Sequence, residues 1–144
     1  MAWEAIEASL REKGAGDVKW RQGRTGLYIF NAGEEVERVK KAAYAMFSEE
    51  NGLGPAAFPS LAQLEREIVD FGLSLLNAPE GAAGGMTSGG TDSIVMAVKA
   101  ARDYARAKGK SGAFNIVTPY SAHPAFHKAA MMMDLELRRT PLKD

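Results

Sequence analysis

Four glycines within seven residues, directly ahead of an amphipathic helix, constrain this chain more than any other feature. The stretch GGMTSGGTDSIVMAVKAA covers residues 84–101, and apolar side chains recur there at helical spacing to about residue 108. Short apolar segments at 82–87 and 113–120 flank this region and are typical of strands. The order strand, glycine loop, helix and strand predicts an α/β fold with parallel strand pairing.

The glycine loop is a candidate site for an anionic group. The N–H groups in the first turn of a helix have no partner within the helix, and the helix dipole favours negative charge there. Glycines let a phosphate approach the backbone without meeting a Cβ atom, and the hydroxyls of Ser88 and Thr91 add donors. The sequence therefore predicts a phosphate site where this helix begins.

Known glycine motifs fit the loop poorly. The nucleotide P-loop requires a lysine where this chain has Gly90, which disfavours a nucleoside triphosphate. The dinucleotide pattern GxGxxG is absent, and the serine-hydrolase elbow would place Thr87 at the nucleophile position. A loop that only needs flexible turns remains an alternative to a phosphate site.

Helical patterns precede the glycine loop. We predict helices over about residues 3–13, 34–50 and 60–75, and the last begins with a capping box made by Ser60 and Gln63. The predicted buried face of the third helix consists of Leu61, Leu64, Ile68, Phe71 and Leu75.

The pattern changes after residue 81. A helix with Pro124 in its first turn follows the strand at 113–120, and the alternating residues 134–139 indicate another strand. We therefore predict a helical N-terminal segment over residues 1–80 and the first strands and helices of an α/β domain over 81–144.

Composition excludes several classes of protein. The formal net charge is zero, so no overall field attracts nucleic acid or an anionic membrane. The chain has no cysteine, which excludes disulfides and thiolate catalysis and favours a reducing compartment. No apolar run approaches the roughly 20 residues that span a bilayer, and the first residues are too charged for a signal peptide. We expect a soluble, cytoplasmic protein without nucleic-acid partners.

Two motifs carry a family resemblance. The segments TSGGTDSIVMAVKAARDYA (87–105) and IVTPYSAHPAFHKAA (116–130) resemble the pyridoxal-phosphate-dependent group II decarboxylases, and within them the sphingosine-phosphate lyase branch. Residues 51–79 resemble the stretch that precedes the glycine loop in that branch. The similarity runs from about residue 20 to the end of the chain.

The resemblance implies an incomplete large domain of the aspartate-aminotransferase type (fold type I) and a homodimer whose active sites use both subunits. It also implies that Ser88, Gly89, Gly90 and Thr91 hold the phosphate of pyridoxal 5'-phosphate, with Gly90 and Thr91 making the tightest contacts. His123 would be the catalytic residue that stacks on the pyridine ring. An intact enzyme of this family would act on an amine or amino-acid substrate through an external aldimine, as a carbon–carbon lyase or decarboxylase.

The chain departs from the family pattern at two positions. Gly54 stands where the lyase branch has a histidine linked to the substrate phosphate, which disfavours a sphingosine-phosphate substrate. Asp92 replaces the usual glutamate and keeps a carboxylate in the first helical turn.

The chemistry of this cofactor needs a lysine that forms a Schiff base, and in the family that lysine lies beyond the position of Asp144. Lys128 lies only five residues after His123, within the Phe-x-Lys-Ala-Ala motif, and is not expected to take this role. We therefore expect the chain to be the N-terminal part of such an enzyme and inactive alone. The alternative is a non-catalytic phosphate-binding or interaction module derived from the same fold.

Two further expectations follow from the residues. His123 and His127 have metal-ligand spacing on a helix, but the second residue of the motif is Pro124 rather than a glutamate, and a third ligand is not evident. We therefore expect no metal site. The strands at 82–87 and 113–120 would lack the neighbours that the rest of the fold provides, so we expect the isolated chain to fold poorly or to depend on a partner.

Overall fold

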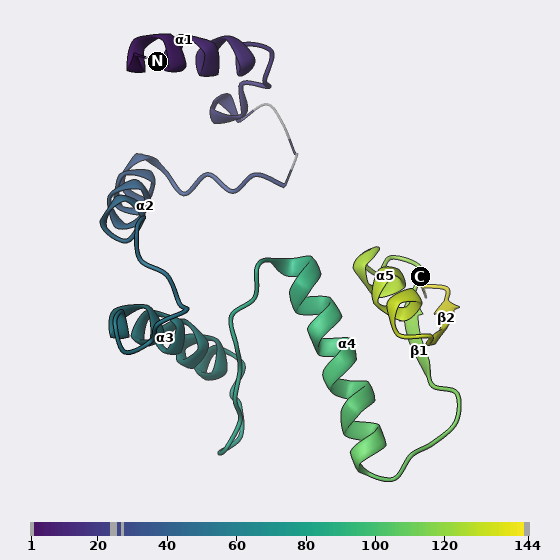
Figure 1. Cartoon of the computed structure of the whole chain (residues 1–144). Helices are drawn as coiled ribbons and strands as arrows, with labels where there is room; N and C mark the ends of the chain where they lie inside the picture. Colours follow the sequence, from purple (N-terminus) through teal and green to yellow (C-terminus); the bar gives the residue numbers. More distant parts are fainter. Residues whose placement is uncertain (1, 24–25, 27, 143–144) are drawn as a thin grey trace. The chain divides into compact units, whose positions relative to one another are not determined.

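The computed structural model describes residues 2–23, 26 and 28–142 (Figure 1). The chain divides into two compact units, Met1–Glu50 and Asn51–Asp144, which we describe separately as the first and the second unit. The predicted division into residues 1–80 and 81–144 stays a prediction.

The first unit holds α1 (Trp3–Lys13), η1 (Trp20–Gln22) and α2 (Glu34–Met46). The helix predicted over 3–13 is confirmed, and Gly14 follows its last turn. The segment 14–33, between the first two predicted helices, includes residues 24–25 and 27, which lie outside the described residues.

Helix α2 is shorter than the predicted span of 34–50. Its last helical residue is Met46, after which Phe47 leaves the helical conformation with φ −123°. The hydroxyl of Ser48 then donates to the carbonyl oxygen of Ala45 at 3.3 Å. Such a local side-chain bond competes with continuation of the helical ladder, and the apolar pattern alone does not reveal it.

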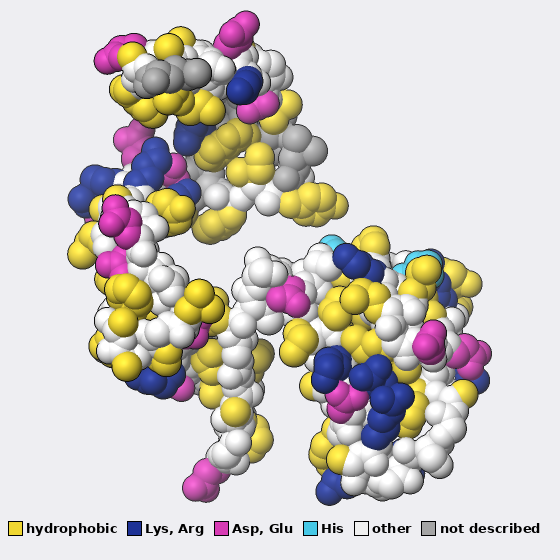
Figure 2. Space-filling model, in the orientation of Figure 1, with side chains coloured by type: hydrophobic (Ala, Val, Ile, Leu, Met, Phe, Trp, Pro, Cys, Tyr) yellow, Lys and Arg dark blue, Asp and Glu magenta, His cyan; other side chains and the backbone are white. Residues whose placement is uncertain are grey.

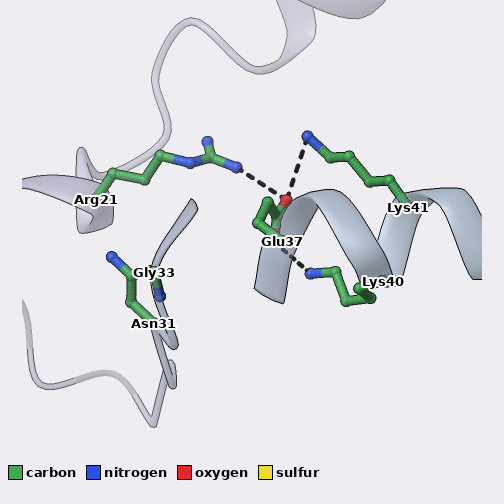
Figure 3. A network of polar contacts seen from close by, with 6 residues as sticks. All are labelled: Arg21, Asn31, Gly33, Glu37, Lys40 and Lys41. Atoms are coloured by element: carbon green, nitrogen blue, oxygen red, sulfur yellow. Dashed lines mark hydrogen bonds and ion pairs between the residues drawn. The ribbon is translucent and has the colours of Figure 1, made fainter. Parts of the chain in front are cut away.

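A charged network joins η1 to the first turn of α2 (Figure 3). The carboxylate of Glu37 accepts a hydrogen bond from Lys40 Nζ at 2.6 Å, and it lies 3.3 Å from Lys41 Nζ and 3.5 Å from the Arg21 guanidinium. The guanidinium also lies over the ring of Trp20, 4.3 Å from its centroid. Hydrogen bonds from Lys40 and Lys41 lower the pKa of the Glu37 carboxyl from its ordinary value of 4.5.

The chain enters α2 through a tight turn. The side-chain oxygen of Asn31 accepts a hydrogen bond from the N–H of Gly33 at 3.1 Å. Gly33 has a φ of +91°, which a residue with a Cβ rarely adopts, and its carbonyl accepts the N–H of Glu37 at 3.1 Å.

The second unit begins with α3 (Pro59–Leu75), and its predicted capping box is wrong. Helix α3 begins at Pro59, after Phe58, so Ser60 lies inside the first turn instead of capping it. Proline suits the first helical position because its missing N–H would have no partner there. The amide of Gln63 instead donates to Glu67 Oε1 at 2.8 Å, one turn along the helix.

The predicted buried face of α3 is largely exposed. Four of its residues keep between 41% and 70% of their surface in contact with solvent, namely Leu64, Ile68, Phe71 and Leu75. Figure 2 shows such hydrophobic side chains on the surface of each unit. The helical spacing was therefore correct, but the described residues do not cover the face that it defines.

The predicted strand at 82–87 does not form, and this segment has no regular secondary structure. A strand needs a neighbouring strand to pair its backbone N–H and C=O groups. This segment also contains two glycines, and glycine weakens the interior of a strand. The segment instead runs along α3, where a Cβ added to Gly84 would lie 3.0 Å from Val69 Cγ1.

The remainder of the second unit alternates helix and strand, as predicted. Helix α4 (Gly90–Ala107) leads to β1 (Asn115–Pro119), and α5 (Ala125–Met132) leads to β2 (Glu136–Thr140). The two strands pair in parallel in a two-stranded sheet, with Ile116 opposite Leu137. Helix α5 is the crossover between these strands and packs against α4, β1 and β2. The α/β expectation is confirmed for this part of the chain.

The core among the described residues is small. Its buried apolar side chains are Val98, Ala125, Ala129 and Ala130, and Thr118 of β1 is buried beside them. No large side chain of the described residues is fully buried. An exposed pair of strands with so little apolar burial is marginally stable.

We therefore expect the purified chain to lack a sharp cooperative thermal transition. Heating should produce a broad loss of the circular dichroism signal at 222 nm, and a dye that binds exposed apolar surface should fluoresce before heating. A sharp transition of a monomer, verified by analytical ultracentrifugation, would contradict this expectation.

The network at Glu37 gives a second prediction. Because its folded pKa lies below the unfolded value, the contact stabilises α2 above about pH 4.5 and is lost as the pH falls through the folded pKa. In a carboxyl-carbon NMR titration, Glu37 should have a midpoint below 4.5, and Lys40→Met with Lys41→Met should raise it. Lys99→Met on α4 is the matched control and should leave the midpoint unchanged. An unshifted Glu37 in the wild type would show that the network does not form.

Candidate functional site

The glycine loop and the segment after β1 lie at the same end of the α4–β1 pair. Helix α4 and strand β1 run in opposite directions (Figure 1), so the start of α4 and the end of β1 lie toward the same side of the second unit. Helix α5 packs against both elements and holds them together. In parallel α/β sheets, ligands bind outside the carboxyl ends of the strands. This end is therefore the expected position for a bound group.

Hydroxyl groups close the glycine loop onto α4. The hydroxyl oxygen of Thr87 lies 2.5 Å from that of Ser93 and donates to the carbonyl oxygen of Gly89 at 3.2 Å. The same carbonyl accepts the N–H of Ser93 at 3.0 Å, which is the first bond of the helical ladder. The carbonyl of Gly89 is thus bound both by the Thr87 side chain and by the N–H of Ser93.

The two central glycines face open space. A Cβ added to Gly89 or Gly90 would meet no atom within 4 Å, and neither residue has a left-handed φ that would itself demand glycine. In the described part of the chain, the N–H groups of Gly89, Gly90 and Thr91 make no hydrogen bond outside the helical ladder. Open space with free donors at a helix start fits a phosphate group.

Ser88 is placed differently from the other predicted phosphate residues. Its N–H and its hydroxyl both donate to Asp92 Oδ2, each at 3.1 Å. Sequence reasoning singled out Asp92 only as a first-turn carboxylate and missed these bonds. The spacing Ser-x-x-x-Asp across a helix start is the signal that could have indicated them.

His123 lies between β1 and α5 and is exposed. Its Nδ1 accepts the backbone N–H of Ala125, the first residue of α5, at 3.1 Å. In the neutral ring this bond leaves the proton on Nε2. The imidazole is therefore held by the helix start, while Pro124 with φ −54° leads the backbone into α5.

The other candidate residues add no site. His127 and Lys128 are exposed on α5. Within the described ranges, no three His, Cys, Asp or Glu residues are grouped so that they could hold a metal ion. A search of the described helices for one long and apolar enough to cross a membrane also finds none.

A separate apolar cavity lies between α4, β1 and α5. It has a volume of about 360 Å³, and none of the glycine-loop residues lines it. Its larger lining side chains are the apolar Val98, Phe114, Ile116, Phe126 and Leu135 and the charged Arg102. The cavity has no carboxylate or imidazole, so it offers little chemistry of its own.

The bond between His123 and Ala125 can be tested directly. His123→Ala should remove the acceptor and speed hydrogen exchange of the Ala125 amide, by about tenfold for the loss of a typical hydrogen bond. His123→Asn, whose side-chain oxygen can accept, should restore part of the protection. His127→Ala on the same helix is the control and should have no effect. Equal exchange in all four proteins would show that the imidazole is not held by α5.

Comparison with known proteins identifies relatives of the whole chain. A scan against models of protein families finds no match. The chain is 41% identical over 136 residues to a sphingosine-1-phosphate lyase of Oryza sativa, covering 89% of this chain and 25% of the lyase. It is 41% identical over 106 residues to a probable L-tyrosine/L-aspartate decarboxylase of Methanothrix thermoacetophila, covering 74% of this chain and 26% of that protein. The chain thus spans about a quarter of the length of these relatives.

The fold is similar as well. The structure of a sphingosine-1-phosphate lyase from Burkholderia pseudomallei matches with a TM-score of 0.87 and 32% identity, over 99% of this chain and 35% of that chain. The described elements therefore form part of a fold type I large domain with the helices that precede it. Over the residues that it spans, the chain belongs to the sphingosine-phosphate lyase-like branch of the pyridoxal-phosphate-dependent group II decarboxylases.

Proposed function

We propose that the chain provides the phosphate cradle and the ring-stacking histidine of a pyridoxal-phosphate-dependent carbon–carbon lyase or decarboxylase. The observation that supports this most is the open backbone at Gly89 and Gly90, with free N–H groups, in a chain related to such lyases. When bound, the cofactor supplies an electron sink for cleavage of a bond at the substrate's α-carbon.

The cradle would consist of Ser88, Gly89, Gly90 and Thr91. The backbone N–H groups of Gly89, Gly90 and Thr91 would donate to phosphate oxygens, and the dipole of α4 would add to the attraction. Because Ser88 gives both its N–H and its hydroxyl hydrogen to Asp92, its contribution is the shape of the loop. The phosphate is thus held mainly by backbone atoms.

His123 would lie against the face of the cofactor ring. The bond from the Ala125 N–H to Nδ1 fixes the plane of the imidazole and leaves Nε2–H for a second partner. A planar side chain on a fixed support suits a planar ligand because little rotational freedom is lost on stacking.

The reaction needs groups that we do not find in this sequence. Lys128 is exposed on α5, close to His123 in sequence, and we do not assign it the Schiff-base role. We propose that a complete enzyme acts on a small amine or amino acid, as a homodimer in the cytoplasm. Gly54 at the position of the lyase histidine argues against sphingosine phosphate as the substrate.

The alternative is a non-catalytic phosphate-binding or interaction module of the same fold. A borohydride experiment tests the absence of a Schiff-base lysine from this chain, which both proposals assume. Reduction after incubation with pyridoxal 5'-phosphate, followed by peptide mass spectrometry, should give no adduct concentrated at one lysine. A specific adduct would assign the Schiff-base lysine to this chain. It would overturn the proposal that the chain provides only the phosphate cradle and the ring-stacking histidine.

A Gly90→Ala variant tests the cradle. Its Cβ meets no atom of the chain, so the fold should persist, but it would enter the space of the phosphate. We expect the affinity for 4-deoxypyridoxine 5'-phosphate, which has no aldehyde, to fall about tenfold or more when fluorescence titrations are compared. The control is Gly52→Ala, where a Cβ also meets nothing within 4 Å. Equal affinity in both variants, or equal binding of the probe without its phosphate, would refute the cradle.

A further inference from the structure

Asp92 connects the glycine loop to the first turn of α4. One of its carboxylate oxygens, Oδ2, accepts both the N–H and the hydroxyl of Ser88, each at 3.1 Å. The Asp92 side chain is half-buried, whereas Ser88, Gly90 and Thr91 are exposed. Hydrogen bonds to a carboxylate are stronger than neutral ones, and Asp92 accepts two of them from one residue of the loop.

This tie decides which donors face a ligand. The N–H of Ser88 is directed to Asp92, so the donors left at the helix start are those of Gly89, Gly90 and Thr91. Thr87 and Ser93, the next pair of residues outward, form a second tie, because their hydroxyl oxygens lie 2.5 Å apart. The two ties together hold both ends of the three-residue backbone that carries the free donors.

A carboxylate beside an anion site has an electrostatic disadvantage. Asp92 lies in the first turn, where it interacts well with the helix dipole but repels a bound phosphate. If charge were its only effect, removing it would strengthen phosphate binding. Its value to the site must therefore come from the geometry that it imposes on Ser88.

We propose that Asp92 is a positioning residue of the phosphate cradle: it holds Ser88 away from the ligand and thereby orients the N–H groups of Gly89, Gly90 and Thr91 toward it. This role rests on the proposed phosphate site. Asp92 touches no phosphate itself, and it contributes a shape that a neutral acceptor of the same size can partly replace.

The first test measures the loop without any ligand. Hydrogen exchange of the Ser88 amide, followed by NMR on the full chain, should be protected in the wild type and about tenfold faster in Asp92→Ala. Asp92→Asn should lie between them because its oxygen still accepts. The matched control is Asp103→Ala, which removes a carboxylate from the same helix, where Asp103 contacts Lys99 and Arg102. An unprotected Ser88 amide in the wild type, or equal exchange in Asp92→Ala, would overturn the proposal.

The second test measures binding of 4-deoxypyridoxine 5'-phosphate by fluorescence. Asp92→Ala should bind about tenfold more weakly than wild type, and the affinity of Asp92→Asn should lie between those of Asp92→Ala and wild type. A purely electrostatic role predicts tighter binding by both variants, and that result would overturn the proposal. If the wild type does not prefer the probe over 4-deoxypyridoxine, the phosphate site itself fails. If the wild type does prefer it and Asp92→Ala binds equally well, only the role of Asp92 fails.

Discussion

The close packing of α5 is the contact on which the rest of the second unit depends. Three alanines, Ala125, Ala129 and Ala130, are almost completely buried on this helix. Their small side chains let α5 approach α4 and both strands at once. Since α5 is also the crossover between parallel strands, its position fixes the register of β1 with β2. The same helix contacts α4, which follows the glycine loop, and β1, which precedes His123.

The candidate site is made of backbone more than of side chains. The open glycines supply free N–H groups, and the hydroxyl and carboxylate ties around them set the direction of those groups. His123 follows the same rule, because its ring is held by a backbone N–H at the start of α5. Both helix starts thus orient the groups that a phosphorylated planar ligand would meet.

Local signals in the sequence predicted those parts of the structure that need no distant partner. Helices α1 and α4 follow from apolar spacing and from the glycines beside them, and the glycine loop follows from its own composition. The prediction of a strand at 82–87 was wrong because strand formation depends on a neighbouring strand. The prediction of a capping box at Ser60 was wrong because Pro59 takes the first helical position. The bonds of Asp92 and His123 depend on side-chain rotamers, which spacing alone does not determine.

The length of helix α4 makes the position of its first turn sensitive to how its last turn is held. It is continuous over 18 residues, which at 1.5 Å each is about 27 Å. A tilt of about 5° at its far end would therefore carry the near end through roughly 2 Å, enough to misplace a cradle of amides. At that far end the guanidinium of Arg106 lies 5.7 Å from the ring centroid of Phe114. This modest aromatic contact joins the far end of the helix that carries the glycine loop to the residue just before β1.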